Sequence, residues 1–177
     1  MTRLLRRPLF RAGLLIAAVL GAFGLYWFQP WKLVTDQTVD EALATVAAPA
    51  DVPQATPSGP VLVRQGEFVT HEHRTNGIAR VIRHADGSHR LELVGLDTSN
   101  GPDLRVWLSD QPVRTGPAGW RVFDDGDWVE LGRLKGNKGD QTYVIPAGTD
   151  LNRLGSVSIW CKRFSVSFGA AELATPS

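Results

Sequence analysis

Turn-forming residue pairs recur at short intervals through most of this chain, and they limit what it can fold into. The pairs are Asn76-Gly77, Asp86-Gly87, Asn100-Gly101, Gly116-Pro117, Asp125-Gly126 and Lys138-Gly139. The runs between them are short, and no long helical period appears. Eighteen glycines and eleven prolines among 177 residues also favour turns over a helical bundle. The sequence therefore predicts an all-β fold, an antiparallel β-sandwich or barrel-like domain, over residues 61–177.

The N-terminal part contains a candidate membrane segment. Residues 12–31, AGLLIAAVLGAFGLYWFQPW, carry no charge and are about long enough to cross a bilayer as a helix. The run ends with aromatic side chains that suit a membrane interface: Tyr26, Trp27, Phe28 and Trp31. Residues 1–11 include four arginines: Arg3, Arg6, Arg7 and Arg11. Because basic residues favour the cytoplasmic side, the sequence predicts a single-pass membrane protein with a cytoplasmic N-terminus and an extracytoplasmic C-terminal domain.

A cleavable signal peptide is the competing interpretation of the same residues. The aromatic end of the run is a poor small-residue cleavage site, which favours a retained signal anchor. Residues 32–60 then lead to the domain. Within them, residues 36–48 are expected to form a short helical segment. Residues 47–60, with four prolines, are typical of a semi-extended tether that holds the domain off the membrane.

Residues 157–169, VSIWCKRFSVSFG, hold the single cysteine, Cys161. Apolar and polar residues alternate up to Cys161 and then change phase, so we expect a strand with a bulge or bend at Lys162 and Arg163. One cysteine excludes an intrachain disulfide and a zinc site of several cysteines. Cys161 is then a small buried hydrophobic residue, a reactive thiol or a partner in an intermolecular link.

The four histidines fall within one short region: His71, His73, His84 and His89. If Asn76-Gly77 and Asp86-Gly87 each form a two-residue hairpin turn, alternation puts all four side chains on one face of a three-stranded meander. His84 would then lie opposite His89. Imidazole is the commonest metal ligand, so a metal or haem-iron site is one hypothesis, and solvated strand histidines are the alternative.

Charge and motifs narrow the possible functions further. The formal net charge of +1 suggests no nucleic-acid partner. No serine lies in a GxSxG nucleophile elbow. A thiolate nucleophile at Cys161, activated by a histidine and by Lys162 and Arg163, remains as an enzymatic alternative.

Several stretches together resemble the DM-thirteen domain, a family labelled electron-transfer. The matching stretches are GEF at 66–68, HRTNG at 73–77, TSNGPDLRVWLS at 98–109, LGRLKGNKGDQTYVIP at 131–146 and VSIWCKRFSVSFGAAEL at 157–173. The resemblance covers nearly all of the expected domain and keeps the order of the motifs. It implies that Cys161 matches the family's cysteine, a proposed redox or haem-linked residue, and that His73 matches its histidine.

The resemblance also implies a membrane association and a separate electron partner, since family members occur beside DOMON and b-type cytochrome domains. The first hypothesis is therefore an electron-transfer or redox-linked accessory role centred on Cys161, with His73 as a possible helper. The sequence does not identify a cofactor; haem or another metal is an option, because thiolates are recognised haem ligands. The alternative is a non-catalytic binding module of the cell envelope with a buried structural cysteine.

Overall fold

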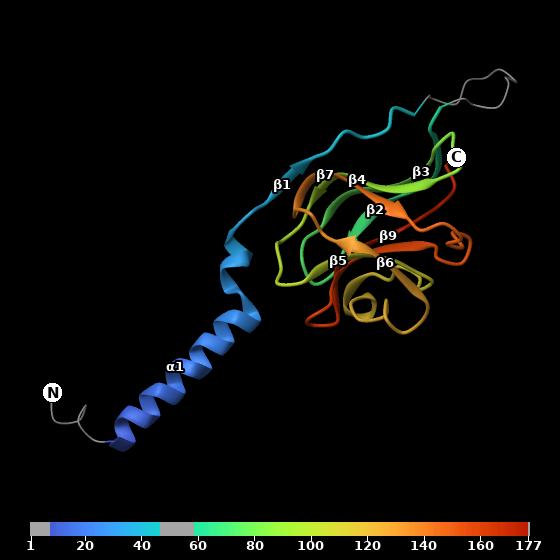
Figure 1. The fold of residues 1–177 in the computed structure, drawn as a ribbon. Coiled ribbons are helices and arrows are strands. Elements are labelled where there is room, and N and C mark those ends of the chain that lie inside the picture. Colours follow the sequence, from blue (N-terminus) through green and yellow to red (C-terminus); the bar gives the residue numbers. More distant parts are fainter. Residues whose placement is uncertain (1–7, 47–58, 177) are drawn as a thin grey trace, which may run out of the picture.

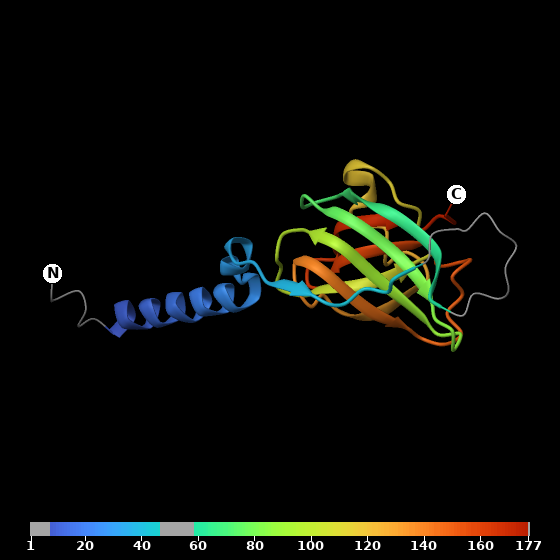
Figure 2. The same ribbon diagram turned by 90° about the horizontal axis from the view of Figure 1, so that it is seen from above.

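One α-helix and one curled sheet dominate this computed structural model, which describes residues 8–46 and 59–176. Helix α1 (Pro8–Phe28) leaves the sheet at one end, as Figures 1 and 2 show. It is long and apolar enough to cross a membrane, and none of its residues is buried in the protein. Residues 1–7, with three of the N-terminal arginines, and residues 47–58, most of the expected tether, lie outside the described residues.

In the described part of the chain, nine strands form the sheet. They are β1 (Thr38–Asp40), β2 (Val61–Thr70), β3 (Asn76–Arg83), β4 (His89–Asp97), β5 (Leu104–Ser109), β6 (Trp128–Arg133), β7 (Lys138–Ile145), β8 (Ser156–Cys161) and β9 (Val166–Glu172). Their order across the sheet is β1-β7-β4-β3-β2-β9-β8-β5-β6. The sheet curls into a half-barrel, visible in Figure 2, so the predicted all-β, barrel-like domain behind an apolar helix is confirmed. Among the strands of the described residues, only β1 and β7 pair in parallel.

Two apolar clusters lie on opposite faces of the sheet. The main core fills the inside of the curl and takes side chains from β2 through β9. A smaller cluster of Trp107, Phe123, Trp160 and Ala170 lies on the outer face. The loop of residues 110–127, with the short 3-10 helix η3 (Gly116–Gly119), covers this second cluster. Every residue of β8 is therefore buried, although its side chains alternate between the two faces.

The alternation of apolar and polar residues changes phase after Cys161 because β8 ends there, not because the strand contains the predicted bulge. A bend does occur at Lys162 and Arg163, but there the chain reverses in a four-residue hairpin turn between β8 and β9. Phe164 N–H donates to the Cys161 carbonyl at 3.2 Å, and Ser165 has a positive φ of 48°. Four-residue hairpin loops are commonly built around such a turn. A register shift in this pair lies one step earlier, between Ile159 and Trp160.

The two-residue hairpin turns expected at Asn76-Gly77 and Asp86-Gly87 were wrong, because neither pair forms such a turn. Asn76 and Gly77 lie inside β3, where Gly77 (φ 120°) belongs to a bulge against β4. The connection from β2 is instead the loop of residues 71–75. At the other end of β3, Arg83 rather than His84 faces His89, because His84 N–H bonds Ser88 O across a wider loop. A glycine with positive φ serves a bulge as well as a two-residue turn.

The segment after helix α1 lies along the edge of the sheet. The expected short helix at residues 36–48 was wrong for its described part, since β1 forms there and pairs with β7. The 3-10 helix η2 (Pro30–Val34) precedes it. The segment is held by side chains as well, because Glu41 accepts hydrogen bonds from Lys135 and from Thr142. Strands β1 and β2, which are consecutive in the chain, thus belong to one sheet.

Candidate functional site

Cys161 is the last residue of β8, paired with Leu104 on β5 and Val166 on β9. Its side chain points into the main core, and its exposed fraction is 0%. Burial raises the pKa of the Cys161 thiol, and the backbone amides of Phe164 and Arg163 offset this only in part. The thiol is therefore neutral at physiological pH and shielded from solvent. This state disfavours a thiolate nucleophile, which needs a lowered pKa and access.

The surroundings of Cys161 do not fit a haem group or a metal ion. Core side chains enclose the sulfur completely, so a ligand of haem size would have to displace them. Within residues 8–46 and 59–176, no three His, Cys, Asp or Glu side chains come together in a group that could hold a metal ion. In this conformation the core offers no place for these groups at Cys161.

His73, the expected helper, lies in the loop after β2. Its ring packs against Phe168 with a centroid distance of 3.9 Å, and Phe168 belongs to the same core cluster as Cys161. Burial lowers the pKa of His73, with Glu72 acting weakly in the opposite direction. His73 thus borders the cysteine-bearing core as a largely uncharged ring.

His71 is buried on the other side of the sheet. Its Nδ1 lies 2.8 Å from Ser167 Oγ, and its Nε2 lies 3.0 Å from the Arg114 carbonyl. Ser158 Oγ donates to Ser167 Oγ at 2.9 Å and extends this network to β8. Burial lowers the pKa of His71, because the charged ring would lose its hydration. His71 therefore ties the covering loop of residues 110–127 to the sheet.

His84 and His89 lie at the opposite end of β3 from His71 and His73, so the structure does not bring the four histidines together. His84 borders a pocket of about 340 Å³ between the sheet and residues 42–44. The buried Nε2 of His84 has no hydrogen-bond partner among the described residues. The expected shared face failed because it depended on two hairpin registers that the chain does not adopt.

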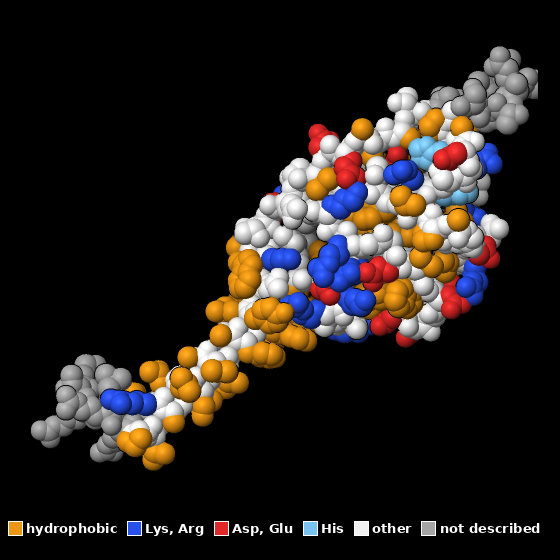
Figure 3. Space-filling view, in the orientation of Figure 1, with side chains coloured by type: hydrophobic (Ala, Val, Ile, Leu, Met, Phe, Trp, Pro, Cys, Tyr) orange, Lys and Arg blue, Asp and Glu red, His pale blue; other side chains and the backbone are white. Residues whose placement is uncertain are grey.

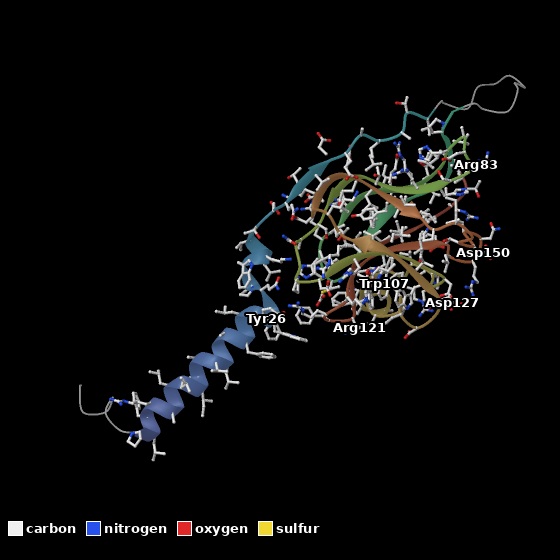
Figure 4. The ribbon with its side chains drawn as sticks, in the orientation of Figure 1. Tyr26, Arg83, Trp107, Arg121, Asp127 and Asp150 are labelled. Carbon is white, nitrogen blue, oxygen red and sulfur yellow. The ribbon has the colours of Figure 1, made fainter. Side chains whose placement is uncertain are left out.

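A stack of three indoles connects β8 to the surface. Trp160 (β8) is 5.1 Å from Trp107 (β5), and Trp107 is 4.0 Å from Trp128 (β6) with nearly parallel ring planes. Trp160 and Trp107 are buried, whereas Trp128 is 40% exposed. Figure 4 labels Trp107, the middle ring of the stack. Indole rings can lose and regain a single electron, so a stack at contact distance can pass electrons between the surface and β8.

The stack carries a carboxylate at its middle ring. Trp107 Nε1 donates to Glu130 Oε2 at 3.3 Å, and Arg105 and Lys162 also contact Glu130. Burial raises the pKa of Glu130, but these partners outweigh it and hold the pKa below the ordinary value. Glu130 is thus a permanent negative charge beside Trp107, where it would stabilise a positively charged indole.

Sequence reasoning missed the indole stack. Trp160 is next to Cys161 in the sequence, but their side chains point to opposite faces of β8. The signal available in the sequence was the alternation within each strand, which places each tryptophan on the face opposite to the main core. Joining the three rings also required the strand order β8-β5-β6, which is non-local information.

The comparison with protein families gives one match. A family model described as electron transfer DM13 matches residues 67–173, which includes Cys161, His71, His73 and all three stacked tryptophans. The comparisons with curated proteins and with solved structures gave no match. The matched residues form most of the chain and nearly all of the curled sheet. The chain therefore belongs to the DM13 electron-transfer family.

Proposed function

We propose that this protein is a membrane-tethered electron-transfer domain, with Cys161 as its redox-linked residue and the three indoles as its route to the surface. The family match supports a redox-related role. The observation that carries the proposal is the Trp128–Trp107–Trp160 stack, which leads from an exposed ring to the residue beside Cys161. The electron partner is a separate molecule that carries a one-electron redox centre and approaches Trp128.

The proposed chemistry moves single electrons along the stack. An acceptor at the surface gains one electron and Trp128 loses one. Trp107 then gives one electron to Trp128, and Trp160 gives one electron to Trp107. In the net reaction the acceptor is reduced by one electron and Trp160 is oxidised by one. No bond breaks in these steps, and the indole Nε1 protons stay in place. Cys161 is the next oxidisable group along β8. When its neutral thiol gives one electron to the oxidised Trp160, the S–H bond breaks, the proton is released to water and a thiyl radical remains, whereas the raised pKa of the thiol disfavours nucleophilic chemistry.

We further propose that the domain is extracytoplasmic and that the N-terminus is cytoplasmic. Helix α1 can cross a membrane by length and composition, and four arginines precede or begin it. Protease added to sealed vesicles of known sidedness tests this topology. Digestion of the domain only from the cytoplasmic side would reverse the assignment.

A flash-quench experiment on the full chain tests the electron route. Tris(bipyridine)ruthenium is excited in the presence of a cobalt(III) ammine, which takes one electron from it and leaves a ruthenium(III) oxidant. The background carries Trp27→Phe and Trp31→Phe, because these two indoles are also exposed. We expect an indole radical in the absorption transient, a smaller and slower signal in Trp128→Phe, and no change in Trp120→Phe, whose ring lies outside the stack.

The same experiment tests Cys161 separately. If the Cys161 thiol gives an electron to the oxidised indole, the indole radical should persist longer in Cys161→Ser than in the parent chain. An equal lifetime in both chains would remove Cys161 from the redox role, whereas an unchanged signal in Trp128→Phe would remove the stack.

The second candidate is a binding module of the cell envelope in which Cys161 is structural. The complete enclosure of Cys161 and its raised pKa favour this reading over a thiol-dependent enzyme. It would apply if both flash-quench tests failed while the domain remained folded.

A further inference from the structure

The hairpin turn that follows Cys161 contacts the end of the membrane-length helix. The ring of Phe164 stacks on the ring of Phe28, the last residue of α1, with a centroid distance of 5.7 Å. A second contact lies nearby, where Lys32 Nζ donates to the Gly101 carbonyl at 3.1 Å. The domain thus meets the helix through a defined part of its own surface.

Arg163 fixes this contact through the backbone of the helix. Its Nη1 donates to the carbonyls of Tyr26 and Trp27, and its guanidinium lies over both of their rings. The last carbonyls of a helix have no partner within the helix, and a cation there also interacts favourably with the helix dipole. Arg163 therefore caps α1 from a turn more than 130 residues away in sequence.

The contact of Arg163 with the end of α1 fixes the depth at which the turn lies relative to a bilayer that α1 crosses. The 21 residues of α1 rise about 30 Å, which matches the hydrocarbon thickness of a membrane. Tyr26 and Trp27 then lie at the level of the headgroups, where aromatic side chains prefer to be. Arg163 contacts these two residues, and Phe164 stacks on the adjoining Phe28, so the turn lies at the same level.

The charges around the turn complement an anionic membrane surface. The basic turn consists of Lys162, Arg163 and Arg121, and Arg121 Nη1 donates to the carbonyls of Phe164 and Ser165. Among the described residues, the acidic side chain in contact with this group is Glu130, whose Oε2 lies 3.4 Å from Lys162 Nζ. Figure 3 shows Lys and Arg side chains gathered on the part of the domain next to the apolar helix. Anionic lipid headgroups attract basic residues placed near the membrane.

We propose that the basic turn is a membrane-contact element that binds the headgroups of anionic phospholipids and seats the Cys161 end of the domain on the bilayer. The proposal rests on the proposed crossing of the membrane by α1 and is independent of the electron-transfer role. It differs from a domain held off the membrane, because the helix end and the turn are in direct contact. Any partner that reaches this end of the domain must then approach along the membrane surface.

Hydrogen exchange of the unmodified full chain tests the contact without a substitution. The chain is reconstituted in vesicles of phosphatidylcholine alone and in vesicles that also contain phosphatidylglycerol. We expect the peptide covering residues 162–165 to exchange more slowly in the anionic vesicles, and added salt to remove the difference by screening. Equal exchange in both kinds of vesicle would overturn the proposal.

Matched variants identify the residues responsible. The double variant Lys162→Gln/Arg163→Gln should lose the extra protection in phosphatidylglycerol vesicles. Arg83→Gln is the control, since Arg83 is exposed on the far side of the domain from Tyr26 in Figure 4, and it should keep the protection. Protection that persists in the double variant would show that the basic turn does not bind the headgroups.

Discussion

At the scale of single residues, the enclosure of Cys161 predicts how its thiol reacts. Because the sulfur has no exposed surface and burial raises the pKa of the thiol, N-ethylmaleimide should not label the folded chain. Unfolding in guanidinium should make the labelling complete, as measured by intact mass. Lys162→Cys adds a half-exposed thiol next to the native one and is the positive control. Fast single labelling of the folded parent chain would contradict the core position of Cys161.

The buried His71 and the half-buried His73 predict a loss of stability in mild acid. Burial lowers the pKa of both His71 and His73 below the ordinary value of 6.5. In mild acid the unfolded chain therefore binds more protons at these two residues than the folded chain does. Their contribution to stability is therefore complete above pH 6.5 and is lost as the pH falls from there towards their folded pKa values. The free energy of unfolding, measured by denaturant titration at several pH values, should decline in this window.

The double variant His71→Gln/His73→Gln provides the comparison for this pH dependence. Glutamine does not titrate, so the decline below pH 6.5 should flatten even if the overall stability is lower. An equally steep decline in the double variant would assign the acid sensitivity to other groups.

At the scale of elements, Gly66 lies one residue before the place where the pairing of β2 passes from β3 to β9. Glu67 still pairs with Ile78 of β3, whereas Phe68 pairs with Ala171 of β9. A Cβ at position 66 would lie 1.8 Å from the Glu172 carbonyl oxygen, so one of the two backbones would have to move. We expect Gly66→Ala to lower the free energy of unfolding by about 1–3 kcal/mol, measured by denaturant titration.

Gly155→Ala is the matched control for this crowding. Its Cβ would have Glu172 Oε1 as its nearest neighbour at 3.9 Å, an ordinary contact, so stability should change by less than about 1 kcal/mol. Equal effects of the two substitutions would mean that the close approach at Gly66 does not limit the sheet.

The elements also show which features of this chain local patterns can predict. Alternation up to Cys161 identified β8 and the bend after it, because both depend on neighbouring residues. The Asn76-Gly77 pair misled because its glycine conformation suits a bulge within β3 as well as a turn. Local patterns could not predict the indole stack, because Trp107, Trp128 and Trp160 meet only when β5, β6 and β8 lie side by side.

At the scale of the whole molecule, the chain between α1 and the sheet is part of the fold. Gln37 N–H bonds Asn137 Oδ1 at 2.7 Å, and β1 continues the sheet beyond β7. Further along, Ala44 N–H donates to Glu92 Oε1 at 2.8 Å, while Arg80 donates to the Ala44 carbonyl and to Glu92 Oε2. Helix α1 and the curled sheet are thus joined through several hydrogen bonds, consistent with a domain held close to the helix end.

Glu92 is the residue on which this attachment depends most, because its carboxylate is almost fully buried and serves both Arg80 and Ala44. Glu92→Gln leaves the mostly buried Arg80 without a countercharge and places an amide group opposite a donor. We expect a loss of about 2–4 kcal/mol in the free energy of unfolding and faster hydrogen exchange at residues 41–46. Asp86→Asn is the control, because this exposed carboxylate bonds only Ser88 in its own turn among the contacts described. Unchanged exchange at Ala44 in Glu92→Gln would show that β1 alone holds the segment to the sheet.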